Sequence, residues 1–192
     1  KKRPAYLKVR VDIHMESKCP DTTDFIHNHF YPAWTKDSVR KIMDIHIFPF
    51  GKASCEKRGS DDFQCHCQHG EQECMTNKLM NCVIERLKDP EKYVPIIRCL
   101  QGKDMDMTAE CFKEADLPVS GFQACARGKE GRRLLAETGV IKESLEPKLF
   151  YVPWVLINDV RHEYENFLNS VCAAFTGPLP DDCPVPTPEH KN

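Results

Sequence analysis

The sequence contains no apolar run long enough to cross a bilayer. Its longest apolar stretch, residues 149–157, has nine residues, whereas a spanning helix needs roughly 20. No signal-peptide pattern is present and the first residue is Lys, so we expect a processed or trimmed chain. The chain also lacks any N-x-S/T sequon, so it offers no acceptor for an N-linked glycan.

Neither sign of charge dominates. The 27 Lys and Arg residues nearly balance the 29 Asp and Glu residues, which leaves a formal net charge of -2. Such a balance gives no long-range attraction to nucleic acid or to an anionic membrane, and we expect neither as a partner. The length of 192 residues and the 41% hydrophobic fraction fit one globular domain, with or without a sizeable insertion.

Cysteine, in contrast, is abundant, with eleven residues in the chain. In an oxidising compartment so many cysteines form a framework of disulfides. Because the count is odd, ten can pair within the chain and one cannot.

Hydrophobic periodicity predicts strands and helices in alternation. The strands are expected at residues 7–14, 43–50 and 150–157, and a helix should begin near Pro20. The polar stretch 51–64 indicates a loop or hairpin. Further helices are expected at residues 71–88, 91–100, 108–115, 121–127, 131–138 and 162–175, and a proline-rich tail follows from Gly177. This order predicts an α/β, thioredoxin-like fold interrupted by helices.

The most specific motif is the segment CQHGEQECMTNKLMNC, residues 67–82. It resembles the signature of the gamma-interferon-inducible lysosomal thiol reductase (GILT) family, CQHG-x2-EC-x2-N-x4-C. Every fixed position of that pattern is filled here, by Cys67, Gln68, His69, Gly70, Glu73, Cys74, Asn77 and Cys82.

The resemblance covers nearly the whole chain and implies a fold. It implies one thioredoxin-like domain over residues 1–192, with a core of about residues 5–50 and 147–176. A helical, disulfide-tied insertion would span about residues 51–146, and the tail would occupy residues 177–192. The family uses no cofactor and reduces protein disulfides in acidic endolysosomal compartments.

Cys19 falls at the expected strand-to-helix junction. The resemblance implies that Cys19 is the nucleophile. A helix N-terminus would favour this role, since it stabilises a thiolate. Asp21 and Asp24 oppose this effect with negative charge. The alternatives are that Cys19 is inert or is paired with a cysteine outside the motif.

Thr22 stands where the family has the second cysteine of a C-x-x-C pair, and no C-x-x-C occurs in the chain. A reductase needs that second thiol to resolve the mixed disulfide with its substrate. A hydroxyl cannot do so, and can at best donate a hydrogen bond to the sulfur of Cys19. Dithiol reduction is therefore expected to be weak or lost.

Val152 and Pro153 resemble the element of thioredoxin-like folds that faces the nucleophile. There a cis proline opens a strand, and the preceding residue presents its backbone to an extended substrate. The alternative is an ordinary trans proline at a strand start.

The other ten cysteines are expected in disulfides. Cys55 and Cys65 flank a polar loop and could close a hairpin, while Cys172 with Cys183 could clamp the tail. Cys99 with Cys111 could tie two short helices, but spacing does not fix connectivity. The ten are Cys55, Cys65, Cys67, Cys74, Cys82, Cys99, Cys111, Cys125, Cys172 and Cys183.

A zinc site is the alternative for Cys65, Cys67, His69 and Cys74. Their spacing does not match paired C-x2-4-C knuckles, so we expect no metal. His69 could instead cap the following helix, lie near the thiol or stabilise a turn. We expect Glu73 and Asn77 to support the local backbone.

Three functions remain open at this point. The first is a one-thiol oxidoreductase acting on a disulfide-containing protein or peptide, with glutathione or another external thiol completing the cycle. The second is a secreted, non-catalytic binding protein built on the reductase scaffold. The third is an engineered Thr22 that traps mixed disulfides. The expected location is extracellular or the endolysosomal lumen, and the missing sequon weakly favours the binding protein, since lysosomal sorting by mannose phosphate needs N-glycans.

Overall fold

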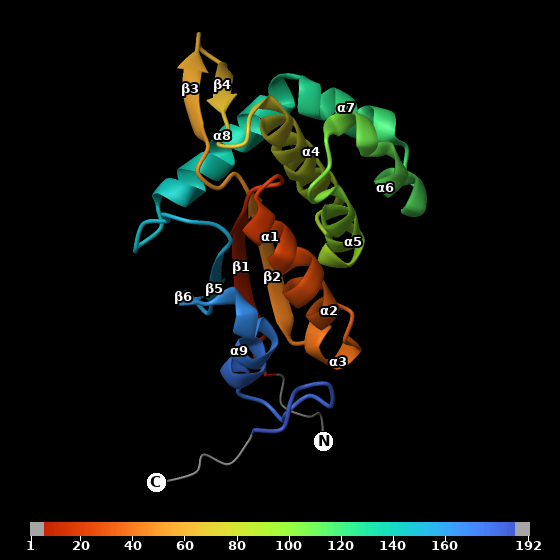
Figure 1. Ribbon diagram of the computed structural model, residues 1–192, viewed down its shortest axis with the longest axis vertical. Helices are drawn as coiled ribbons and strands as arrows, with labels where there is room; N and C mark the ends of the chain where they lie inside the picture. Colours follow the sequence, from red (N-terminus) through yellow and green to blue (C-terminus); the bar gives the residue numbers. More distant parts are fainter. Residues whose placement is uncertain (1–5, 187–192) are drawn as a thin grey trace.

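A four-stranded sheet forms the centre of the molecule (Figure 1). The computed structural model describes residues 6–186. The strand order is β2-β1-β5-β6, with β1 at Val9–Met15, β2 at Met43–Pro49, β5 at Trp154–Ile157 and β6 at Val160–His162. β1 runs parallel to β2 and antiparallel to β5, so strands from both ends of the sequence form one sheet.

The central position of β1 explains its sequence. Six of its seven residues are buried, because the strand is covered on both faces. β2 lies at the edge and alternates buried with more accessible residues, as a strand with one covered face does. β1 ends at Met15, directly before the segment that leads to Cys19.

The C-terminal part of the sheet differs from the sequence prediction. The predicted strand at residues 150–157 begins only at Trp154, and the predicted helix at residues 162–175 is wrong at its start. Asn158 and Asp159 have φ values of 48° and 66°, which make a tight hairpin turn into β6. A 3₁₀ turn, η3 (Tyr164–Asn166), follows, and the helix itself is α9 (Phe167–Ala174).

The helical segment after Cys19 is unbroken but not uniform. α1 (Pro20–Asp24) continues into a π-helix, η1 (Phe25–Phe30), and then α2 (Tyr31–Trp34). α3 (Asp37–Arg40) leads into β2. The π-helix packs against α9 through edge-to-face contacts of Phe167, 5.4 Å from Phe25 and 5.7 Å from Phe30 between ring centroids.

The residues between β2 and β5 form a hairpin and a block of helices. Figure 1 shows the hairpin projecting at one end of the molecule, with α9 at the other end. The hairpin alternative for residues 51–64 is confirmed. α7 and α8 begin two residues earlier than predicted, and α8 also runs five residues further than predicted. The elements are β3 (Ser54–Arg58), β4 (Asp62–His66), α4 (Glu71–Leu87), α5 (Pro90–Leu100), η2 (Met105–Met107), α6 (Ala109–Glu114), α7 (Val119–Arg127) and α8 (Lys129–Glu143).

Five disulfides tie these elements. One closes the β3–β4 hairpin, one joins the loop before α4 to that helix, and one links α4 to α7. The last two connect α5 to α6 and α9 to the tail. The pairs are Cys55–Cys65, Cys67–Cys74, Cys82–Cys125, Cys99–Cys111 and Cys172–Cys183.

The tail has a second attachment besides its disulfide. The carboxylate of Asp182 accepts hydrogen bonds from the hydroxyl and the backbone N–H of Ser38, at 2.7 and 3.2 Å. Residues 187–192 of the predicted tail, and residues 1–5 at the other end of the chain, lie outside the described residues. Among the described residues, every helix falls short of the length or hydropathy that crossing a membrane requires.

Candidate functional site

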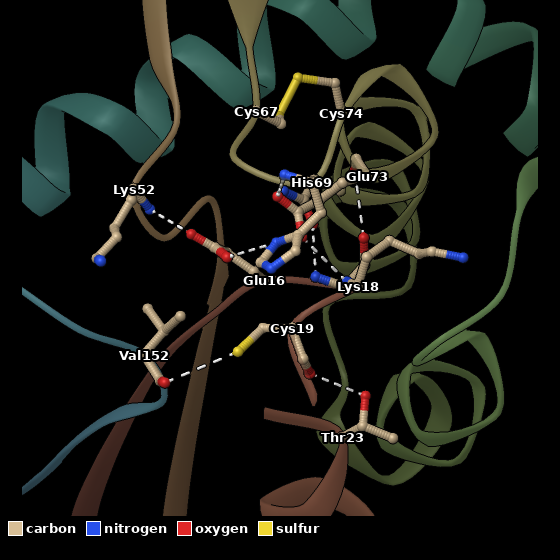
Figure 2. A network of polar contacts seen from close by, with 12 residues as sticks. Glu16, Lys18, Cys19, Thr23, Lys52, Cys67, His69, Glu73, Cys74 and Val152 are labelled. Carbon is tan, nitrogen blue, oxygen red and sulfur yellow. Dashed lines mark hydrogen bonds and ion pairs between the residues drawn. A yellow bond between two sulfur atoms is a disulfide. The ribbon is translucent and has the colours of Figure 1, made fainter. Parts of the chain in front are cut away.

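Cys19 lies where the chain passes from the sheet into α1 (Figure 2). It occupies the N-cap position with extended backbone angles, and Pro20 fills the first helical position, where no N–H is needed. Its carbonyl oxygen accepts hydrogen bonds from the backbone N–H and the hydroxyl of Thr23, both at 3.0 Å. All eleven cysteines lie within residues 6–186, and Cys19 is the one that is free.

The sulfur of Cys19 faces the loop before β5. It lies 3.9 Å from the carbonyl oxygen of Val152, and the peptide bond between Val152 and Pro153 is cis. Cys19 is 8% exposed and packs in a small apolar cluster with Trp154 and Leu149. The exposed part of Cys19 therefore lies beside the Val152 backbone.

Thr22 lies one turn into α1 and is fully buried. Its hydroxyl has no hydrogen-bond partner among the described residues, so it does not donate to the sulfur of Cys19. A hydroxyl at this position cannot supply the second thiol of a disulfide exchange.

The segment between β1 and Cys19 is fastened to α4. The backbone N–H of Ser17 donates to Oδ1 of Asn77 at 3.0 Å, and that of Lys18 donates to Oε2 of Glu73 at 3.2 Å. The hydroxyl of Ser17 also donates to the carbonyl oxygen of Glu73 at 3.2 Å. Two residues of the sequence motif therefore hold the backbone that positions the free thiol.

His69 links two carboxylates at the same place. Its Nδ1 lies 2.7 Å from Oε2 of Glu73 and 3.2 Å from Oε2 of Glu16, and its backbone N–H donates to Oε1 of Glu73 at 3.1 Å. Figure 2 shows the three side chains turned toward one another above Cys19.

Glu16 is a residue of this site that the sequence analysis missed. It is fully buried, and its Oε1 accepts a hydrogen bond of 2.8 Å from the backbone N–H of Lys52. Burial raises the pKa of Glu16, and the neighbouring charge of Glu73 acts in the same direction. The signal in the sequence was a carboxylate just after a predicted strand, where a buried position was to be expected.

Two glycines shape the backbone around these carboxylates. A Cβ at Gly51 would overlap the side chain of Glu16 and lie 2.6 Å from its Oε1, and Gly51 has a φ of 61°. Gly70 caps α4 with a φ of 87°, a conformation that residues with a side chain rarely adopt. Gln68, the remaining polar residue of the motif, is exposed.

The zinc alternative for Cys65, Cys67, His69 and Cys74 is wrong. Cys65 is bonded to Cys55, and Cys67 is bonded to Cys74, so none of the three sulfurs is a thiolate.

Comparison with known proteins agrees with this geometry. The family model described as "Gamma interferon inducible lysosomal thiol reductase (GILT)" matches residues 10–115. GILT-like protein C02D5.2 of Caenorhabditis elegans is 38% identical over 187 residues, covering 95% of this chain and 57% of that protein. Gamma-interferon-inducible lysosomal thiol reductase of Mus musculus is 32% identical over 185 residues, covering 94% of this chain and 73% of that protein.

Solved structures show the fold. Chlamydia trachomatis DsbA has a TM-score of 0.63 at 13% identity, covering 88% of this chain and 87% of that chain. BdbD from Bacillus subtilis has the same TM-score and identity, covering 86% of both chains. The predicted α/β, thioredoxin-like fold is confirmed by these neighbours.

Proposed function

Because the chain belongs to the gamma interferon inducible lysosomal thiol reductase family, we propose that it is a one-thiol oxidoreductase acting on protein or peptide disulfides. The observation that carries this proposal is the state of the cysteines. Ten are paired, and Cys19 alone is free, at the start of a helix and facing a cis proline.

The proposed chemistry has two steps. The thiolate of Cys19 attacks one sulfur of the substrate disulfide, a bond forms between the two sulfurs, and the other substrate sulfur leaves as a thiolate that takes up a proton. An external thiol such as glutathione then attacks the substrate sulfur of the mixed disulfide, and the sulfur of Cys19 leaves as a thiolate again. The external thiol is needed because Thr22 stands in the position of the second cysteine. The net result of these two steps is a substrate mixed disulfide with glutathione, which a second glutathione reduces.

The Val152 backbone provides the docking element in this proposal. Its carbonyl faces the sulfur of Cys19 at 3.9 Å, so an extended polypeptide that lies along this loop would bring its disulfide to the thiol. No cofactor takes part in this exchange, since the electrons come from the external thiol.

One observation favours a second candidate, a secreted binding protein without turnover. Cys19 is only 8% exposed and lacks a partner cysteine at the position of Thr22. Such a protein would use the scaffold for contact with another protein.

The experiment that separates the two candidates is reduction of insulin or a disulfide peptide, with and without glutathione, at acidic and neutral pH. A one-thiol enzyme gives glutathione-dependent turnover that disappears in Cys19→Ser. If the unchanged chain shows no turnover and Thr22→Cys does, the proposal of enzymatic function is refuted and the binding protein is favoured.

We also propose an oxidising location, either extracellular or in the endolysosomal lumen. Five disulfides in a chain of this size are typical of such compartments and rare in the cytosol. Fractionation of cells that express the natural protein would test this, and a cytosolic pool with reduced cysteines would contradict it.

A further inference from the structure

Glu16, His69 and Glu73 bring three metal-ligating atoms to one point. One carboxylate oxygen of each glutamate and one ring nitrogen of His69 all lie within 4.8 Å of one another. The residues come from three segments, namely the end of β1, the loop before α4 and the first turn of α4 (Figure 2). The thiol exchange proposed above uses none of these side chains directly.

The charges of this cluster do not balance. Glu16 and Glu73 are both fully buried, and within residues 6–186 the one titratable cation at hydrogen-bond distance from them is His69. The nearby Lys18 and Lys52 bond to the carboxylates through their backbone N–H groups, and the ammonium of Lys52 acts on Glu16 only through its charge. The Nζ of Lys18 binds Asp104, and Figure 2 shows that of Lys52 turned away. Within hydrogen-bond distance, these two buried carboxylates thus share at most one positive charge among the described residues.

One oxygen in the cluster is also left without a donor. Nδ1 of His69 carries at most one hydrogen, and the shorter contact of 2.7 Å directs it to Glu73. Oε2 of Glu16 is buried and accepts no hydrogen bond, although it points at Nδ1 from 3.2 Å. A buried charged oxygen of this kind is costly unless a cation or a proton satisfies it.

The spacing of the donors suits a small divalent ion. Ligands at about 2.1 Å from a tetrahedral zinc ion are roughly 3.4 Å apart. The two contacts of Nδ1 measure 2.7 and 3.2 Å, so Nδ1 and each oxygen need to move apart by less than about 1 Å, and the two oxygens lie within 4.8 Å of each other. The side chain of His69 is 33% exposed, which provides an entry path and room for a water as the fourth ligand.

We propose that Glu16, His69 and Glu73 bind a divalent transition-metal ion, with Zn²⁺ as the best match to one imidazole and two carboxylates. The ion replaces the hydrogen on Nδ1, accepts one oxygen from each glutamate and balances the buried charge. It joins the end of β1 to α4, and so fastens the segment that leads to Cys19. The proposal does not depend on whether Cys19 turns over substrate.

The test uses the full chain with its disulfides intact and with Cys19→Ser, so that the free thiol cannot bind the metal. After treatment with EDTA and desalting, Zn²⁺ is titrated by calorimetry and in thermal denaturation. We expect one ion per chain, in the micromolar range or tighter, with an increase in Tm. Glu16→Gln and His69→Gln should each weaken binding by about tenfold or more.

His46→Gln is the matched control, because His46 also contacts a carboxylate, that of Asp44 at 3.1 Å, but on the exposed edge strand. It should leave Zn²⁺ binding unchanged. A second measurement needs no change in the cluster, since NMR should show the His69 ring resonances shifting with one equivalent of Zn²⁺. Absence of saturable binding or unshifted His69 resonances would overturn the proposal. So would Zn²⁺ binding by Glu16→Gln and His69→Gln that is as tight as binding by the chain with an unchanged cluster.

Discussion

Replacing Asn77 with alanine tests whether α4 holds the segment that leads into Cys19. In the structure, Oδ1 of Asn77 accepts the backbone N–H of Ser17 at 3.0 Å, and both residues are fully buried. Alanine removes the acceptor and leaves that N–H without its partner. The hydroxyl of Ser17 keeps its separate hydrogen bond to the backbone of α4.

The magnitude follows from the hydrogen bond that is lost. A buried donor without an acceptor costs about 1–3 kcal/mol. Nδ2 of Asn77 has no partner in the structure, so its removal offsets part of this cost. We expect a loss of about 1–2 kcal/mol in the free energy of unfolding, which leaves a domain of ordinary stability folded.

The same loss should appear locally, in the opening of the segment before Cys19. The lost hydrogen bond lies two residues before Cys19, so local opening of this segment should become about tenfold more frequent, the equivalent of 1.4 kcal/mol. Cys19 is 8% exposed, and its alkylation requires such opening. We therefore expect iodoacetamide to modify Cys19 about tenfold faster in Asn77→Ala, measured on the folded chain by mass spectrometry.

Asn81 provides the matched control. It lies one turn further along α4 and is 8% exposed, and its Nδ2 donates to the carbonyl oxygen of Pro49 at 2.8 Å. Asn81 also donates to the carbonyl oxygen of Asn77 at 2.9 Å and accepts the hydroxyl of Thr138 at 2.8 Å. Asn81→Ala should therefore cost at least as much free energy of unfolding, without exposing Cys19. If both variants accelerate alkylation equally, or if Asn77→Ala changes neither quantity, α4 does not control access to the thiol.

Three further changes address other parts of the structure. Replacing Cys82 and Cys125 with alanine opens a link between residues 43 apart, and urea unfolding should show a loss of about 4 kcal/mol from chain entropy. Arg132→Met should raise the pKa of Asp62 from about 2 toward its ordinary value in an NMR titration, because the hydrogen bond from Arg132 is the largest cause of the lowering and only the backbone N–H of Phe63 and the charge of Lys129 remain. Because the folded pKa is lowered, this ion pair stabilises the fold above the ordinary pKa of Asp62 and is lost as pH falls through about 2. Gly51→Ala should lower Tm, since its Cβ would overlap a buried glutamate side chain, and an unchanged Tm would contradict that packing.

The fold could be predicted from the sequence because the patterns that indicate its helices and strands are local or strongly periodic. The buried β1 and the amphipathic α4 appear in the sequence as apolar patterns, and the motif over residues 67–82 gave the family. The failures have equally local causes. Asn158 and Asp159 form a turn with positive φ, which periodicity does not detect, so the short strand β6 was not predicted and its last residue, His162, was placed at the start of the helix. The start of the neighbouring strand was placed too early for a related reason, because residues 150–153 are apolar but bend around a cis proline.

The polar contacts around Cys19 could not be predicted in the same way. Ser17 and Asn77 are 60 residues apart, and no spacing rule relates a backbone N–H at the end of a strand to a side chain in a distant helix. Glu16 is also far in sequence from both His69 and Glu73, so its role is visible only once the helical block is packed on the sheet. This separation explains why the motif identifies the family without revealing its purpose. Its polar residues Glu73 and Asn77 hold the segment that leads to Cys19, the free cysteine of this chain.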